Sequence, residues 1–91
     1  MAAGSTCTVY LKPAAERALK KIKDETSRRR IVRAIDGLAA TPRPAGAVAI
    51  QGGEGLLRIR SGDFRILHTV QDEVLTVLVV NVGHRREVYR R

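Results

Sequence analysis

The chain has 91 residues, 44% of them hydrophobic, which suits one small globular domain over residues 1–91 and excludes a disordered chain. Its single cysteine, Cys7, excludes an internal disulfide and a cysteine-based metal site, and without a signal peptide or a long apolar run we expect a cytoplasmic protein with no membrane span. The net charge of +8 favours an anionic partner, either a nucleic acid or an acidic protein.

The first half of the chain predicts a strand followed by two helices. Residues 7–12 alternate apolar and polar side chains, as a strand does. Residues 13–23 begin with a proline suited to the first helical turn and carry an apolar stripe opposite a basic face. Residues 24–41 repeat that pattern, with Asp24 or Thr26 as the candidate N-cap. We expect the two helices to form a hairpin in which each buries one stripe.

The second half predicts three strands after a connecting loop. The loop is rich in Gly, Pro and Ala and includes a short extended piece at residues 48–50. The strand-like runs, separated by tight turns at 61–63 and 71–73, are residues 56–60, 64–71 and 74–82. The last run is apolar at nearly every position, which is typical of a central strand covered on both sides.

These elements together predict an α+β fold. An antiparallel sheet, made of the N-terminal strand and the C-terminal three-stranded meander, packs against the N-terminal helical hairpin. The other face of the sheet is then left partly free.

Three arginines gather around the predicted hairpin of residues 56–71. Strand alternation places Arg58 and Arg60 on one face and Ile59 on the other, and it brings Arg65 to the same outer face. The guanidinium group matches phosphate oxygens, so this cluster indicates a phosphate site. The alternative is a solvated edge strand whose charges prevent aggregation.

A second cluster closes the chain in the sequence VGHRREVYRR. His84 can exchange a proton near neutral pH, Arg85 and Arg86 add positive charge, and Tyr89 can stack on a base. Arginine, histidine and tyrosine side chains around a basic surface could cleave RNA through its ribose 2′-hydroxyl without a metal or another cofactor. A structural role is the alternative for both His84 and Tyr89.

The other histidine, His68, has the same strand parity as Phe64 and Ile66. We interpret it as a packed strand residue and not as a catalytic one.

The segments RIRSGDFRI (residues 58–66) and VGHRREVY (residues 82–89), together with the order of elements, resemble toxins of the RelE family from bacterial toxin–antitoxin pairs. The resemblance runs over nearly the whole chain. It implies a RelE-like fold and ribosome-dependent cleavage of messenger RNA in the A site, by 2′-hydroxyl attack and without metal. It also implies a RelB-like antitoxin, with the toxin monomeric alone and hetero-oligomeric in the complex.

The resemblance also implies roles for individual residues. Arg58 and Arg60 match two basic RNA-binding positions before the turn, and Arg65 matches the arginine that holds the phosphate. Arg85 matches the arginine near the leaving group, and Tyr89 matches the tyrosine that stacks on or orients the substrate.

The family often carries lysine at the strand positions, whereas this chain has arginine at both. Because arginine stays protonated, it is a poor general base, and His84 becomes the candidate for proton transfer. Three alternatives stay open: a ParE-like inhibitor of DNA gyrase, a non-catalytic RNA- or ribosome-binding module, and a degenerate toxin that keeps its antitoxin but no longer cleaves.

Overall fold

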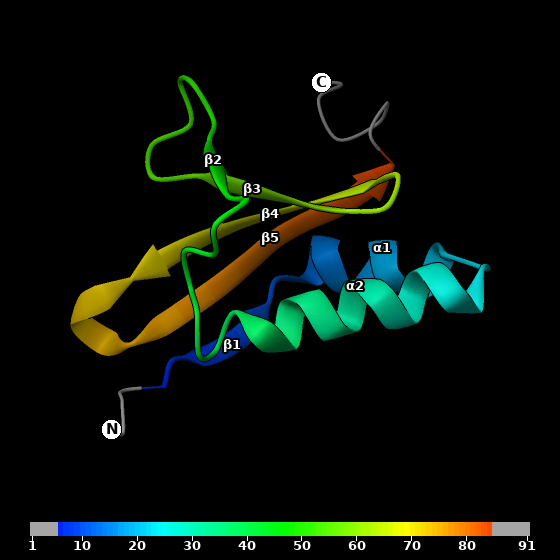
Figure 1. Cartoon of the computed structure of the whole chain (residues 1–91), viewed down its shortest axis with the longest axis horizontal. Helices are drawn as coiled ribbons and strands as arrows, with labels where there is room; N and C mark the ends of the chain where they lie inside the picture. The colour runs from blue at the N-terminus through cyan, green and yellow to red at the C-terminus, as the bar shows by residue number, and fades with distance from the viewer. Residues whose placement is uncertain (1–5, 85–91) are drawn as a thin grey trace.

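The computed structural model describes residues 6–84, and within this range two helices cover one face of a five-stranded sheet (Figure 1). The elements in chain order are β1 (Thr8–Leu11), α1 (Pro13–Lys21), α2 (Glu25–Gly37), β2 (Val48–Ala49), β3 (Leu57–Ser61), β4 (Phe64–Gln71), a 3₁₀ turn (Asp72–Val74) and β5 (Thr76–His84). The sheet order is β1-β5-β4-β3-β2. The predicted α+β class, with a helical hairpin on one face of the sheet, is confirmed. Neither described helix is long and apolar enough to cross a membrane.

The first strand joins the sheet in a direction that differs from the prediction. We expected an antiparallel sheet throughout, but β1 runs parallel to β5, with Thr8 beside Thr76 and Leu11 beside Val79. The other neighbours in the sheet are antiparallel, as expected. Parallel neighbours need a long crossover connection, and the chain between β1 and β5 includes both helices.

The corner between the helices is held by side-chain hydrogen bonds. Pro13 begins α1 at a position where its missing N–H costs nothing. Asp24 caps α2, since its carboxylate accepts a 2.6 Å bond from the Ser27 hydroxyl and a 3.2 Å bond from the Thr26 N–H. The bond from Ser27 is also the main reason that the pKa of Asp24 is lowered. Arg28 donates a 2.8 Å bond to the carbonyl of Ile22, which fixes α2 to the end of α1.

The two turns of the meander differ in kind. β3 and β4 are joined through Gly62 and Asp63, and Gly62 has φ 61°, as a two-residue turn with glycine first requires. The second turn was predicted to be tight, but it is a 3₁₀ turn closed by Leu75 with φ 47°. Arg43 from the loop after α2 holds this turn through bonds of 3.0 and 2.8 Å to the two Asp72 carboxylate oxygens.

The hydrophobic core lies between the helices and the sheet, and it is aliphatic. Its buried members are Ala15, Ile31, Ile35 and Leu38 from the helical segment and Ile59, Ile66, Val77, Val79 and Val82 from the sheet. Cys7 is a free, buried thiol that also belongs to this core. β5 is an interior strand, although β4 holds the middle position. The side of β5 that faces the helices is buried, whereas Leu78 and Val80 are only half-buried. The predicted burial of this strand on both faces is therefore not found.

His68 is wholly buried in the sheet, which confirms its interpretation as a packed strand residue. Its Nε2 lies 2.9 Å from the carbonyl oxygen of Pro42, so it joins β4 to the loop after α2. Burial lowers the pKa of His68 from its ordinary value of 6.5; the bond to Pro42 opposes this shift, and the charge of Arg43 adds to it. The folded protein therefore favours the neutral imidazole.

We expect the stability of the protein to fall in mild acid because of His68. Above about pH 6.5 the imidazole is neutral in both states. Below that pH the unfolded chain takes up the proton first, so the free energy of unfolding drops by at most about 1.4 kcal/mol per pH unit. Urea unfolding at about pH 7.5 and about pH 5.5 measures the drop, and His68→Phe should reduce it. Equal drops in the wild type and His68→Phe would contradict this account.

Candidate nucleic-acid interface

Three arginines occupy the face of the β3–β4 hairpin that points away from the helices. In the register of this hairpin, Arg60 lies directly opposite Arg65, and Arg58 lies opposite Leu67. We call the outer surface formed by Arg58, Arg60 and Arg65 the arginine face. The alternate residues point to the core, where Ile59 pairs with Ile66. Strand alternation had predicted this division.

Within the arginine face, Arg60 and Arg65 bring two like charges together on neighbouring strands. Side chains directly opposite on antiparallel strands have Cβ atoms about 4.5–5.5 Å apart, so Arg60 and Arg65 repel each other. Within residues 6–84 the two ion pairs are Arg29–Glu25 and Arg43–Asp72, and neither includes Arg60 or Arg65. An arrangement that opposes folding in this way is typical of a site that binds an anion.

The Arg65 side chain is half-buried, and few of its hydrogen-bond donors have a partner in the described part of the chain. Its Nε is shielded from solvent and has no hydrogen-bond partner in the described part of the chain. One Nη makes only a long 3.5 Å contact with the carbonyl of Phe64. On the other side of β4, the residue opposite Arg65 is Gly83, which carries no side chain. Because this long contact is the one bond of its terminal nitrogens within the described residues, the Nη donors of Arg65 can bind an anion.

His84 lies at the end of β5 on the helix side of the sheet. It pairs with Phe64, and the two rings meet edge to face with their centroids 5.7 Å apart. Gly83, one residue earlier, faces Arg65 on the outer side. Sequence reasoning grouped His84 with the arginines, but it did not fix the side to which the strand turns its last residue. The structure places His84 beside the arginine face and not on it.

The other residues of the predicted cleavage site, Arg85, Arg86 and Tyr89, lie outside the described residues. Their roles stay predictions. Within residues 6–84 no three His, Cys, Asp or Glu side chains come together in a group that could hold a metal ion.

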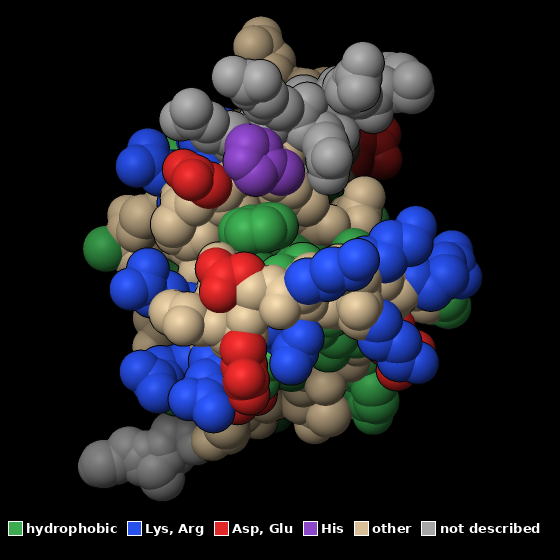
Figure 2. Space-filling model, turned by 90° about the vertical axis from the view of Figure 1, so that its right-hand side faces the viewer, with side chains coloured by type: hydrophobic (Ala, Val, Ile, Leu, Met, Phe, Trp, Pro, Cys, Tyr) green, Lys and Arg blue, Asp and Glu red, His purple; other side chains and the backbone are tan. Residues whose placement is uncertain are grey.

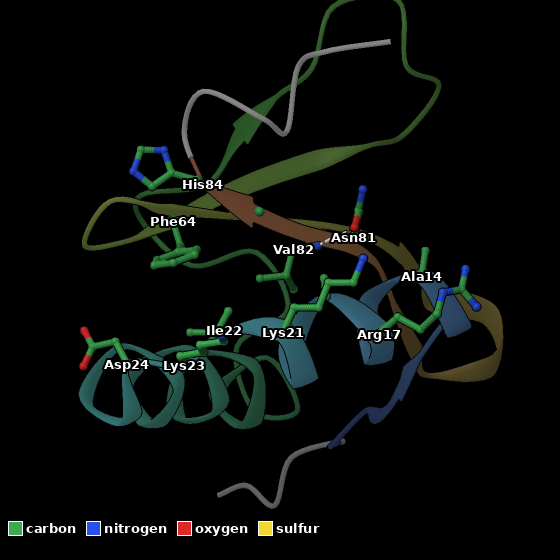
Figure 3. Close-up of a pocket in the computed structure, with 12 residues that line it drawn as sticks. Ala14, Arg17, Lys21, Ile22, Lys23, Asp24, Phe64, Asn81, Val82 and His84 are labelled. Carbon is green, nitrogen blue, oxygen red and sulfur yellow. Dashed lines mark hydrogen bonds between the residues drawn. The ribbon is translucent and has the colours of Figure 1, made fainter.

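A groove of about 700 Å³ runs between α1 and the end of β5 (Figure 3). We call it the α1–β5 groove. Its lining residues include Arg17 and Lys21, Phe64 and Val82, and His84. Figure 2 shows basic side chains on both sides of apolar atoms at this end of the molecule. Sequence reasoning treated the α1 cations only as a helix exterior, although the spacing of Arg17 and Lys21 by four residues puts them on one side of the helix.

The chain is similar to known toxins over nearly its whole length. A family model for the ParE toxin of type II toxin–antitoxin systems matches residues 9–89. Toxin RelG of Mycobacterium tuberculosis is 30% identical over 84 residues, which are 92% of this chain and 97% of RelG.

Solved structures show the same fold. The toxin–antitoxin complex RelBE2 of Mycobacterium tuberculosis contains a chain with a TM-score of 0.76 and 25% identity, and the match covers 89% of this chain and all of that one. The archaeal RelE–RelB complex of Pyrococcus horikoshii gives a TM-score of 0.76 at 21% identity, covering 92% of this chain and all of that one.

We expect Arg60→Gln to stabilise the fold, because it removes the repulsion with Arg65. The gain in the free energy of unfolding should be about 0.5 kcal/mol at low salt, and it should shrink as salt is added. Arg33→Gln, on the exposed side of α2, is the matched control and should bring no such gain. Thermal or urea unfolding measures both. A clear loss of stability in Arg60→Gln would show that Arg60 supports the fold.

Proposed function

Because this chain belongs to the RelE/ParE superfamily of toxins from type II toxin–antitoxin systems, we propose that it is a ribosome-dependent endoribonuclease that cuts messenger RNA in the A site. The observation that carries this proposal is the Arg60–Arg65 pair, two arginines directly opposite each other on the side of the sheet that the helices leave open. Two guanidinium forks can bind the oxygens of one phosphodiester between them.

The proposed reaction is an intramolecular transesterification, in which the phosphoryl group passes from the 5′-oxygen of the next nucleotide to the ribose 2′-oxygen. The ribose 2′-oxygen attacks the adjacent phosphorus as its proton leaves, and the bond to the 5′-oxygen of the next nucleotide breaks as that oxygen gains a proton. The products are a 2′,3′-cyclic phosphate and a free 5′-hydroxyl. Arg65, assisted by Arg60, neutralises the charge that grows on the phosphate oxygens in the transition state. We propose Arg58 and Arg86 as contacts to neighbouring phosphates.

The remaining roles follow the family resemblance. We propose that Arg85 acts near the leaving group and that Tyr89 stacks on or orients the substrate. His84 is our candidate for proton transfer, because it follows Gly83, the residue that faces Arg65. For His84 to act, the RNA must bend around the end of β5 and not lie flat on the arginine face.

We propose a RelB-like antitoxin as the protein partner. The relatives from Mycobacterium tuberculosis and Pyrococcus horikoshii were solved as complexes of this kind. A chain with a net charge of +8 attracts an acidic partner, which would neutralise the toxin by covering the arginine face. The toxin alone is then a monomer, and the hetero-oligomer forms with the antitoxin.

A second candidate function is inhibition of DNA gyrase, because the family model that matches this chain describes ParE toxins. ParE toxins share the fold and, as a group, lack the arginines and the tyrosine of the nuclease site. The presence of Arg65 opposite Arg60 therefore favours the nuclease. Mapping transcript ends after induction separates the candidates: in-frame cuts support the nuclease, DNA breaks support gyrase inhibition, and neither supports a non-catalytic binder.

We expect Arg65→Gln to lower the rate of cleavage on programmed ribosomes by at least about 100-fold, since it removes a donor aimed at the developing charge. The measurement is the rate at which a ribosome-bound transcript is cut in the A site. Arg33→Gln removes the same charge from α2 and should cut at nearly the wild-type rate. Wild-type cleavage by Arg65→Gln would overturn the proposed nuclease site.

His84→Gln tests the proton-transfer role. Glutamine keeps the size and polarity of the side chain but cannot transfer a proton, so the rate should fall by about 100-fold or more. The same ribosome assay measures the effect. Full activity of His84→Gln would show that another group moves the proton.

A further inference from the structure

We propose that the α1–β5 groove is a second binding site for single-stranded RNA, continuous with the arginine face around the open edge of β5. The inference rests on the proposed function and adds the path of the substrate beyond the phosphate that is cut. It assigns RNA contacts to Arg17, Lys21 and Phe64.

The open edge of β5 connects the two surfaces. β1 pairs with β5 only from Thr76 to Val79, so residues 80–84 have no strand on that side within the described part of the chain. Asn81 and Gly83 lie opposite Leu67 and Arg65 and thus belong to the side of the arginine face, yet both also line the groove. In Figure 3, Asn81 and Val82 point to opposite sides of β5. The groove therefore ends at the edge of β5 next to the arginine face, and we infer that one extended ligand bends around this edge to contact both surfaces.

The wall formed by α1 carries an excess of positive charge. Arg17 and Lys21 are exposed and one helical turn apart, and Lys23 follows the helix. Figure 3 shows the Lys21 side chain extending from α1 toward β5. Asp24 is the one acid among the described lining residues, and its carboxylate caps α2. Neither ion pair of the described chain involves these cations, so they can bind phosphates.

The floor of the groove suits unstacked bases. Phe64, Val82 and Ile22 supply apolar surface, and the edge-to-face pair of Phe64 and His84 lies at the strand end. Bases of single-stranded RNA stack on aromatic rings without regard to sequence, while cations alongside follow the backbone. The volume of about 700 Å³ is within the usual range for a small-ligand site, which suits a nucleotide unit.

The groove is held in shape before any ligand arrives. The bond of 2.8 Å from Arg28 to the carbonyl of Ile22 fixes the corner between the helices, and the cap formed by Asp24 fixes the start of α2. An acidic amphipathic peptide would meet the same cations and floor. We favour RNA because Gly83, which lines the groove, lies opposite Arg65 on β4, the arginine proposed to hold the phosphate.

The test measures binding of a short, fluorescently labelled 2′-O-methyl oligoribonucleotide, which lacks the attacking hydroxyl and stays intact. The groove variant Arg17→Gln/Lys21→Gln is compared with Lys12→Gln/Lys20→Gln, which removes two exposed cations that do not line the groove. We expect the groove variant to bind at least about tenfold more weakly at low salt. Its slope of log affinity against log salt should be shallower by about 1.4, since each lost contact to a single strand removes about 0.7. Phe64→Leu should weaken binding about fivefold or more with the slope unchanged.

Arg65→Gln is measured in the same binding assay and in the cleavage assay on programmed ribosomes. Failure of the groove inference can then be told apart from failure of the proposed nuclease function. If both double variants bind RNA alike while Arg65→Gln neither binds well nor cleaves, the groove inference is wrong and the proposed nuclease stands. If Arg65→Gln cleaves normally, the nuclease fails, and the oligonucleotide result alone decides the groove. Unchanged RNA affinity with lost antitoxin binding in the groove variant would identify a peptide as the occupant and overturn the inference.

Discussion

The pairing of Ile59 with Ile66 across the β3–β4 hairpin is the contact on which the candidate site depends. Both side chains belong to the core under the helices, and the turn at Gly62 fixes their register. The same alternation turns Arg60 and Arg65 to the outer side. A slip by one residue would expose the isoleucines and drive the arginines into the core, which is far more costly than their mutual repulsion. The core thus holds two like charges side by side on the outer side of the sheet.

Local signals explain how much of the fold could be predicted. Alternation marked the hairpin strands, Pro13 and Asp24 marked the helix starts, and the Gly62–Asp63 pair marked the tight turn. No local sequence signal gives the direction of β1 in the sheet, because that direction depends on the path of the chain between β1 and β5. The position of the second turn was predicted but its type was not, since nothing in its composition indicates a left-handed Leu75.

The sequence predicted the part of the candidate site that lies within one hairpin. It did not predict the parts that depend on how separate elements pack together. The arginine face follows from parity within two neighbouring strands. The side taken by His84 depends on how β5 pairs with β4, which includes an irregular step near His68, so counting residues along β5 does not give it. The α1–β5 groove joins Arg17 to Phe64 across much of the chain, and only the folded arrangement brings them together.

The parallel pairing of β1 with β5 has a consequence for how the protein is made. β1 comprises residues 8–11, while its neighbour begins at residue 76, so β1 is synthesised well before β5. Until the last strand is available, β1 has no neighbour in the sheet and the core lacks Val77, Val79 and Val82. Such distant contacts delay folding, and domains fold as units during synthesis. The sheet and its core therefore cannot be completed during synthesis until β5 has emerged from the ribosome.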